Sequence, residues 1–412
     1  MTMERRQLFS LGGAAAAGIL ASAPLPVRAQ AGRTISASEF GIAGDGRTDD
    51  TRSLQRALDA AFERQAVLLL PPGDYRVRKT LKIEPRGHVT RQCGIIGQGA
   101  RLISEIDDGA NVIEVVSRST FRFLLIQGLD IKGSGRDGHG ILLACRVPGG
   151  EYLYNFCLRD IVVQGCGGDG CHMVGNVFEG QVINCYFRGN GGNGTTFAHS
   201  ENKGILSAVH VFASVFGQNG KHGVALLNNC YDVSFHGCYF LLNQQFGVLA
   251  DNGCTLLSNC GFENNHQGAP DFPRGDAGIY LKNFGTLIGC TAYSIYKQTH
   301  LLRAFIVREL VMVGCSGHGG GAAKGAGLAR LRGARDKANV TLVGCMGRVT
   351  EEDGVEAIEI GGGEGGLRLG SDWRSRNLPR LGNYRLWVDR NGQLRIKKGA
   401  PQSDDDGRPV GA

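Results

Sequence analysis

The sequence lacks the features that mark membrane, nucleic-acid-binding and simple metal-binding proteins. It has 412 residues, of which only 7% are aromatic and 20% are charged. After residue 30, no apolar run approaches the roughly 20 residues needed to span a bilayer. No basic cluster has interleaved aromatic residues, which argues against nucleic acid as a partner. No two cysteines form a C-x-x-C pair, which argues against common zinc and redox motifs.

Glycine, in contrast, is abundant, at 65 of the 412 residues. Because glycine does not recur at every third position, a collagen-like chain is excluded. A hydrophobic content of 42% argues against a disordered chain. Glycine, asparagine and aspartate punctuate short apolar runs, which is typical of many strands joined by many turns. The composition therefore favours an all-β protein, and the length allows one elongated repeat domain.

Residues 1–29 are predicted to be an export signal. Arg5 and Arg6 precede a weakly apolar, alanine-rich run at residues 11–23, and small residues follow near Ala29. The paired arginines resemble a twin-arginine signal, and an ordinary Sec signal is the alternative. Cleavage would remove three arginines and one glutamate, so the net charge would fall from +7 by +2 to +5. The expected location is periplasmic or secreted, and a mildly basic protein favours acidic polymers.

Residues 30–105 are predicted to form an opening unit that covers one end of a larger structure. A helix is expected after Asp50 and Thr51, one of which would cap it with a side-chain oxygen. The apolar face of that helix has five residues at helical spacing: Leu54, Ala57, Leu58, Ala61 and Phe62. A buried strand at residues 66–70 and a turn at residues 71–75 are expected to follow.

This unit carries a recognisable pattern. The run Phe40-Gly41 through Thr51, followed by Gln55, Ala57 and Pro72-Gly73-Asp74-Tyr75, resembles the rhamnogalacturonase/epimerase-like N-terminal region of the pectate-lyase-like superfamily. The resemblance implies a right-handed parallel β-helix that handles polysaccharide. It does not name the reaction, because the superfamily contains lyases, hydrolases, epimerases and binding proteins. Asp45, Asp49 and Asp50 suit Ca²⁺ by type, but the turn and helix cap of this motif is the preferred interpretation.

Residues 106–360 repeat with a period that fits the coils of a β-helix. One column of equivalent positions follows short apolar runs at spacings of 22 to 32 residues: Leu129, Ile161, Cys185, Ser214, Cys238, Cys260, Cys290, Cys315 and Cys345. Leucine-rich repeats share this period, but their Leu/Asn signature is absent. Stacked coils lie about 4.8 Å apart. The six cysteines of this column are therefore predicted to be packed, unpaired interior thiols, with metal or redox chemistry as the alternative.

A second column opens another strand after a glycine, at positions 138, 170, 194, 223, 247 and 278. Polar residues recur five positions later, at His199, Asn228, Asn252 and Asn283, and they predict an asparagine ladder in a turn. Residues 361–412 are predicted to be a hairpin at 384–397 and a polar tail. This ending resembles the tails of tailspike-like proteins, which implies a C-terminal cap or an oligomer contact such as a homotrimer.

The candidate cleft is predicted on the outward strands of residues 137–282, because a β-helix has a filled interior and long excursions build walls beside its outer sheets. The predicted catalytic residues are His172, His199, Asp251 and Lys282, and the predicted substrate-binding residues are Arg136, Asp137 and His139. His199 would be the base, Lys282 would neutralise a sugar carboxylate, and Asp251 would orient the base or act as the acid. In the alternative, His172 points inward and Asp251 caps a turn.

Two functional hypotheses remain open. The first is an enzyme that acts on a uronic-acid polysaccharide as a lyase or epimerase, with glycoside hydrolysis less favoured. The second is a non-catalytic carbohydrate-binding or structural β-helix. The hydrolase pattern lacks its Asn-Thr-Asp element, and Cys171-His172-Met173-Val174 stands where the mannuronan-epimerase-like pattern has Asp-Pro-His-Glu. Polysaccharide is the expected partner, and Ca²⁺ is the candidate cofactor.

Overall fold

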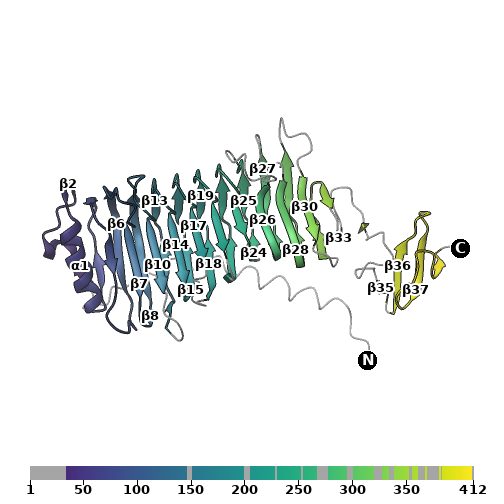
Figure 1. The fold of residues 1–412 in the computed structure, drawn as a ribbon, viewed down its shortest axis with the longest axis horizontal. Coiled ribbons are helices and arrows are strands. Elements are labelled where there is room, and N and C mark those ends of the chain that lie inside the picture. Colours follow the sequence, from purple (N-terminus) through teal and green to yellow (C-terminus); the bar gives the residue numbers. More distant parts are fainter. Residues whose placement is uncertain are drawn as a thin grey trace, which may run out of the picture.

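The computed structural model describes residues 34–145, 151–198, 205–227, 230–251, 254–266, 277–294, 300–319, 327–333, 338–351, 355–360, 367–368, 380–381 and 383–410. These residues form a right-handed parallel β-helix of about nine turns with very little helix (Figure 1). This confirms the predicted fold class. No helix of the described residues is long and apolar enough to cross a membrane.

Each complete coil contributes one strand to each of three parallel sheets. The first sheet contains β5 (Leu81–Ile83), β7 (Ile113–Ser117), β10 (Ile141–Cys145), β14 (Cys171–Gly175), β17 (Thr195–Ala198), β20 (Val224–Leu227), β23 (Val248–Ala250), β30 (Gly327–Gly333), β32 (Val349–Glu351) and the first halves of β26 (Ala277–Ile288) and β28 (His300–Val313).

The second sheet contains β1 (Thr34–Ser36), β3 (Val67–Leu69), β8 (Phe121–Arg122), β11 (Leu153–Tyr154), β12 (Cys157–Arg159), β15 (Val177–Ile183), β18 (Leu206–Phe212), β21 (Cys230–His236), β24 (Cys254–Ser258), β31 (Ala338–Val343) and β33 (Val355–Ile360). The third contains β2 (Asp45–Asp49), β4 (Gly73–Val77), β13 (Val162–Gln164), β16 (Tyr186–Arg188), β19 (Val215–Gly217), β22 (Tyr239–Leu241), β25 (Gly261–Glu263), β27 (Thr291–Ser294) and β29 (Ser316–Gly319). The long strands β6 (Cys93–Ser104) and β9 (Leu124–Lys132) run through both, and β34 (Leu367–Arg368) pairs antiparallel with β33.

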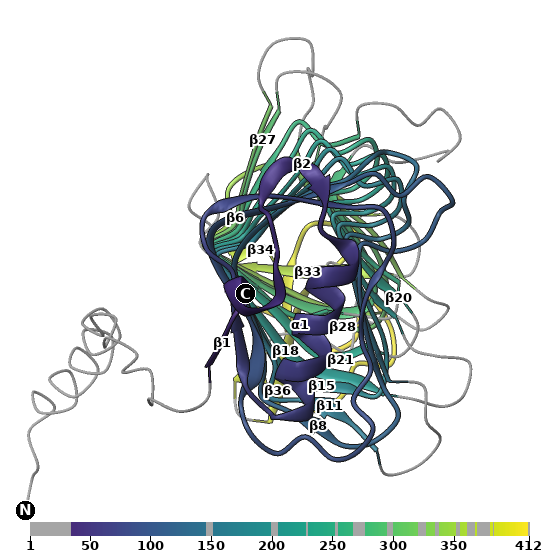
Figure 2. The same cartoon turned by 90° about the vertical axis from the view of Figure 1, so that its left-hand side faces the viewer.

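The opening helix α1 (Thr51–Glu63) follows a short 3-10 turn, η1 (Ala37–Phe40), and lies across the first end of the coil (Figure 2). Its buried residues are the five predicted from helical spacing. The predicted cap is wrong in its chemistry. Asp50 is the N-cap residue, but its carboxylate accepts the backbone N–H groups of Ala43 and Gly44 at 2.7 and 3.0 Å. Asp45 and Asp49 likewise accept nearby backbone N–H groups, as expected for side chains that stabilise a turn.

The predicted cysteine column lies in the interior. All nine positions are buried, and the six cysteines are free. Five of the six thiols contact backbone carbonyls of their own and the preceding coil, as Cys260 contacts those of Ser258 and Phe235 at 3.4 and 3.6 Å. Burial raises the pKa of the Cys185 thiol to about 12. The column is therefore part of the core, as predicted.

Two further ladders fill the interior. Four phenylalanines stack face to face at centroid distances of 5.5, 5.2 and 4.8 Å: Phe187, Phe216, Phe240 and Phe262. Four buried asparagines form an amide ladder in which each Nδ2 donates to the Oδ1 of the next at 2.8 to 3.1 Å: Asn190, Asn219, Asn243 and Asn265.

The observed ladder occupies a different position from the predicted one. The first three members of the observed ladder lie four residues before the column glycine, not five residues after it. Of the predicted members, Asn228 and Asn252 lie outside the described residues, while Asn283 has a left-handed backbone with φ of 76°. The buried corner selects asparagine because each amide satisfies backbone groups of the adjacent coils, such as the N–H of Asn219 and the carbonyl of Phe187.

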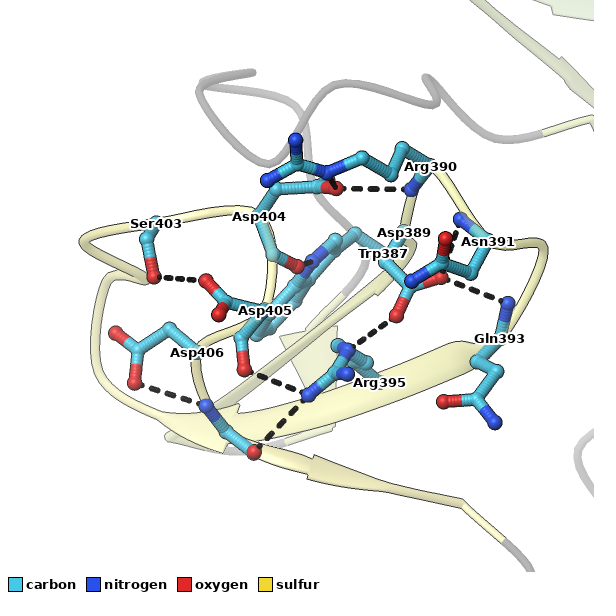
Figure 3. Close-up of polar contacts among 11 residues, drawn as sticks. Trp387, Asp389, Arg390, Asn391, Gln393, Arg395, Ser403, Asp404, Asp405 and Asp406 are labelled. Atoms are coloured by element: carbon cyan, nitrogen blue, oxygen red, sulfur yellow. Dashed lines mark hydrogen bonds and ion pairs between the residues drawn. The ribbon is translucent and has the colours of Figure 1, made fainter.

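The C-terminal strands form a separate antiparallel sheet of β35 (Arg380–Leu381), β36 (Tyr384–Val388), β37 (Leu394–Lys398) and β38 (Arg408–Pro409). The β36–β37 pair is the predicted hairpin. Figure 3 shows how the polar tail closes one face of this sheet. The indole of Trp387 is fully buried and donates to the Asp404 carbonyl at 2.8 Å, and Arg395 pairs with Asp389. The tail thus supplies the second layer that so small a sheet needs.

Candidate functional site

The outer face of the first sheet carries two rows of side chains, one residue from each coil. The first row contains Glu114, Leu142, His172, Thr196, Ala225, Leu249, Tyr280, Arg303 and Arg330. The second contains Val116, Ala144, Val174, Ala198, Leu227, Asp251 and Lys282 in the same registers. Leu142, Ala144 and Val174 form an apolar cluster of their own, apart from the interior core. His172 therefore points outward, and the alternative that it points inward is wrong.

His172 belongs to a compact polar cluster at the edge of this sheet. Its Nδ1 lies 2.8 Å from Asp169 Oδ2, and its ring stacks on that of His139 at a centroid distance of 4.4 Å. Asp169 is buried, whereas both histidine side chains are partly exposed, at 23% for His172 and 29% for His139. An ionised carboxylate only accepts hydrogen bonds, so in the neutral form of His172 the proton is on Nδ1 and the lone pair is on Nε2. Among the described residues, Nε2 has no hydrogen-bond partner.

The cluster sits on a ladder that runs along the corner between the third and first sheets. Each side chain in this ladder accepts the backbone N–H of the next member, at 2.7 to 3.2 Å: Asn111, His139, Asp169, Asn193, His222 and then Phe246. This bonding assigns the lone pair to Nδ1 of His139, so its proton is on Nε2. The ladder holds Asp169 in place and leaves its Oδ2 for His172.

The surroundings favour the charged form of Asp169 and the neutral form of His139. Burial opposes ionisation of Asp169, but hydrogen bonds from His172, the Asn193 backbone and Thr196 outweigh it, so the pKa of Asp169 is lowered. Burial, reinforced by the adjacent His172 ring, lowers the pKa of His139, although Asp169 acts in the opposite sense. An ionised acceptor that orients an imidazole with a free nitrogen is the arrangement of a general base.

Ligand atoms of His139, Asp169 and His172 lie within 4.8 Å of one another, which is close enough for the three to share a metal ion. Ca²⁺ takes six to eight oxygen ligands, and this group provides one carboxylate. His139 Nδ1 and both Asp169 oxygens are already engaged, by backbone N–H groups and by His172. The residues do not fit Ca²⁺, and hydrogen bonding explains their proximity.

The other predicted residues have different positions. Asp137 is buried, and its carboxylate accepts backbone N–H groups of Ser134 and Gly167, so it stabilises a turn and cannot contact substrate. Arg136 is exposed in the same turn. His199 lies outside the described residues. Asp251 pairs with Lys282 at 3.4 Å on the outward face, three coils beyond His172.

Asp251 therefore does not orient His172. Lys282 lies a further coil away, which at about 4.8 Å per coil places it roughly 19 Å from His172. These residues can contact one polymer but not one sugar. Sequence reasoning missed Asp169, Asn193 and Thr196. A signal existed: the strand register aligns Gly140 with Gly170, Gly194 and Gly223, and a polar residue precedes each of them.

Replacing His222 by Asn should make the protein more resistant to acid. Burial, with Lys221 nearby, lowers the pKa of His222 from 6.5 to about 3 in the folded state. Below pH 6.5 the unfolded chain binds a proton that the folded chain does not, so stability falls as the pH drops towards 3, by up to about 1.4 kcal/mol per pH unit. Asn193 already plays the same hydrogen-bonding role one coil earlier.

Thermal melting at pH 7.5 and pH 4.5 tests this. His222→Asn should melt near the wild-type temperature at pH 7.5 and lose less between the two values. His88→Asn, at a side chain with 64% exposure, is the matched control and should retain the wild-type pH slope. An unchanged slope in His222→Asn would show that this histidine does not carry the acid sensitivity.

Three family models match successive parts of the chain. They are the rhamnogalacturonase A/epimerase, pectate lyase-like model at residues 34–118, the right-handed beta helix region at 111–292 and the capsule depolymerase model at 338–412. With the coil architecture, they define a right-handed parallel β-helix protein. The first two support its place in the pectate-lyase-like superfamily, as the opening motif implied.

Individual relatives share only parts of the chain. A mannuronan C5-epimerase of Azotobacter vinelandii is 30% identical over 148 residues, which cover 36% of this chain and 7% of the relative. A glucan 1,3-beta-glucosidase of Cochliobolus carbonum is 34% identical over 84 residues, which cover 20% of this chain and 10% of the relative. The enzymatically active domain of bacteriophage CBA120 tailspike protein 2 has a TM-score of 0.57 at 12% identity, covering 89% of this chain and 58% of that domain. This last likeness shows the fold alone.

Proposed function

We propose that this protein is an exported enzyme that acts on an acidic, uronic-acid polysaccharide as a lyase or epimerase. The observation that carries the proposal is the outward His172, held through Nδ1 by the buried Asp169 and left with a free Nε2. The matched family models and relatives, whose names are those of polysaccharide-active proteins, support the substrate class.

In this mechanism His172 Nε2 removes the proton from C5 of a uronic-acid residue. Asp169 is the positioning residue, because it fixes the ring and stabilises the imidazolium that forms. Epimerisation returns a proton to the opposite face of C5, while a lyase expels the glycosidic oxygen at C4 and leaves an unsaturated sugar. Both need the substrate carboxylate to be neutralised.

Cations further along the first sheet would bind the rest of the polymer. Arg303 and Arg330 project from the outer face on two consecutive coils beyond the Asp251–Lys282 ion pair, and the exposed Arg332 follows on the last of them. Such a strip favours a negatively charged chain. It also supports the second candidate function, a non-catalytic binder of acidic polysaccharide, because binding needs the strip and not His172.

Incubation of the protein with a panel of uronic-acid polymers tests the function. A lyase produces ultraviolet absorbance from unsaturated ends, and an epimerase exchanges the C5 hydrogen with deuterated solvent without new ends. Reducing sugar without absorbance would instead indicate a glycoside hydrolase. Binding with none of these signals would leave the non-catalytic candidate.

Export by the twin-arginine route is part of the proposal. Replacing Arg5 and Arg6 by Lys should leave precursor in the cytoplasm, because the receptor of that route reads guanidinium geometry, which lysine lacks. Fractionation and immunoblotting measure the outcome. Undiminished export of the double variant would indicate the Sec route.

A further inference from the structure

A second polar hollow lies on the outer side of the third sheet, away from His172. It has a volume of about 540 Å³ and spans the ends of four neighbouring strands of that sheet, β9, β13, β16 and β19. We call it the third-sheet groove. Its side-chain walls are Lys132, Gln164, Arg188 and Gln218, and the backbone of Gly133, Gly165 and Gly189 lies between them.

The β-helix register arranges these walls in a regular order. Lys132 is aligned with Gln164, which is aligned with Arg188, on three successive coils. Because adjacent coils lie about 4.8 Å apart, the two cations are separated by roughly 10 Å along the axis, with an amide between them. The order is thus cation, amide, cation, along a line.

Glycine keeps the groove open. Gly165 and Gly189 have φ of 70° and 60°, a left-handed conformation that disfavours other residues. A Cβ atom built on Gly189 would meet no other atom within 4 Å, so the space above it is free. The turn backbone is therefore accessible to a ligand lying across these coils.

The charges in the groove are only partly balanced. Arg101, at one end, is neutralised by Asp130 at 2.8 Å and Asp74 at 3.6 Å. Gln164 donates to Asp130 and accepts a hydrogen bond from Arg188 Nε at 3.2 Å, which fixes both side chains.

In the part of the chain that the structure describes, neither Lys132 nor Arg188 has a carboxylate partner, and both are exposed. The guanidinium of Arg188 also lies over the ring of Tyr186, 5.4 Å from its centroid. The groove therefore presents two cations without carboxylate partners, of which Arg188 is held by Gln164 and lies over an aromatic ring.

We propose that the third-sheet groove is a second binding site for an acidic oligosaccharide. Lys132 and Arg188 would bind two carboxylates on separate sugars, the amide of Gln164 would bind a hydroxyl group between them, and that of Gln218 would bind one on the next coil. Two cations are too few for the phosphate-rich backbone of a nucleic acid, which proteins bind with many more. The proposal rests on the proposed function only for the class of ligand and does not need turnover.

Calorimetric titration of the full protein with a size-defined oligogalacturonate tests the proposal. Wild-type protein should bind at two sites per chain. Lys132→Gln with Arg188→Gln should leave one site, with affinity at the lost site reduced at least about tenfold, the value expected for loss of one charge-assisted hydrogen bond. Lys79→Gln removes an exposed lysine of the opening unit and should leave both sites intact.

A turnover assay on the same protein separates this result from the function of the first sheet. If turnover is absent but the double variant still loses one site, the groove stands and the proposed enzyme activity fails. Equal titrations of wild type and double variant, at unchanged melting temperature, would overturn the groove. Tighter binding of a single-stranded oligonucleotide, or equal binding of a neutral oligosaccharide, would overturn the assigned ligand.

Discussion

Replacing His172 by alanine should reduce turnover of the acidic polymer by about 10² to 10⁴-fold, the usual contribution of a positioned general base. The imidazole is the group whose Nε2 faces outward while Nδ1 is held by Asp169. Alanine also leaves the buried Asp169 without the His172 hydrogen bond, so the melting temperature should fall, and the rates should be compared at a temperature where both proteins are folded. Initial rates of C5 hydrogen exchange or unsaturated-end formation measure the effect.

Asp169→Asn distinguishes positioning from structure. Asparagine retains an oxygen for the Asn193 N–H, but it lacks the charge that stabilises the imidazolium. We expect kcat to fall while KM stays close to the wild-type value, because Asp169 does not touch the substrate. A purely structural role would instead lower the melting temperature with little change in the kcat of the folded fraction.

Two controls make the His172 prediction sharp. His88→Ala removes an exposed imidazole of the opening unit and should keep full activity. Asp251→Asn breaks the ion pair with Lys282 three coils away and should affect KM more than kcat. Full activity of His172→Ala would remove this residue from the mechanism, and loss of kcat in Asp251→Asn would return the chemistry to that pair.

Replacing Asn219 by alanine should destabilise the β-helix by about 3 kcal/mol, the upper range for a buried group whose partners are left unsatisfied. Asn219 is fully buried and lies mid-ladder. Its Nδ2 donates to Phe187 O and Asn243 Oδ1, and its Oδ1 accepts from the backbone N–H of Asn190 and from its Nδ2. Alanine would strand these groups in the interior.

The midpoint of chemical denaturation, followed by far-ultraviolet circular dichroism, measures this loss. Asn184→Gly is the matched control. Asn184 is an exposed asparagine of the preceding coil, with φ of 52°, and later coils have Gly237, Gly289 and Gly314 at the corresponding left-handed position. Asn184→Gly should leave the midpoint of denaturation close to the wild-type value. Equal midpoints for both variants would show that the ladder adds little to stability.

The parts that sequence reasoning predicted correctly depend on patterns that every coil must repeat. This interior position holds a small or apolar side chain in every coil, so the column through Cys260 and Cys290 was visible as a period. The helix face of α1 and the β36–β37 hairpin are local patterns that need no knowledge of distant residues. The ladder through Asn219 was not predicted, because several asparagines lie near the turns and only burial shows that these stack.

The sequence by itself determined the β-helix and its interior thiol column. Only the tertiary structure decided which polar side chains meet. His139 and Asp169 are 30 residues apart and come together because the strands beginning at Ile141 and Cys171 pair in register. Coil lengths vary, so that register cannot be counted along the chain. The same coil stacking separates His172 from Lys282 and brings Lys132, Gln164 and Arg188 into one line, because in a β-helix proximity is set by coil number and strand register.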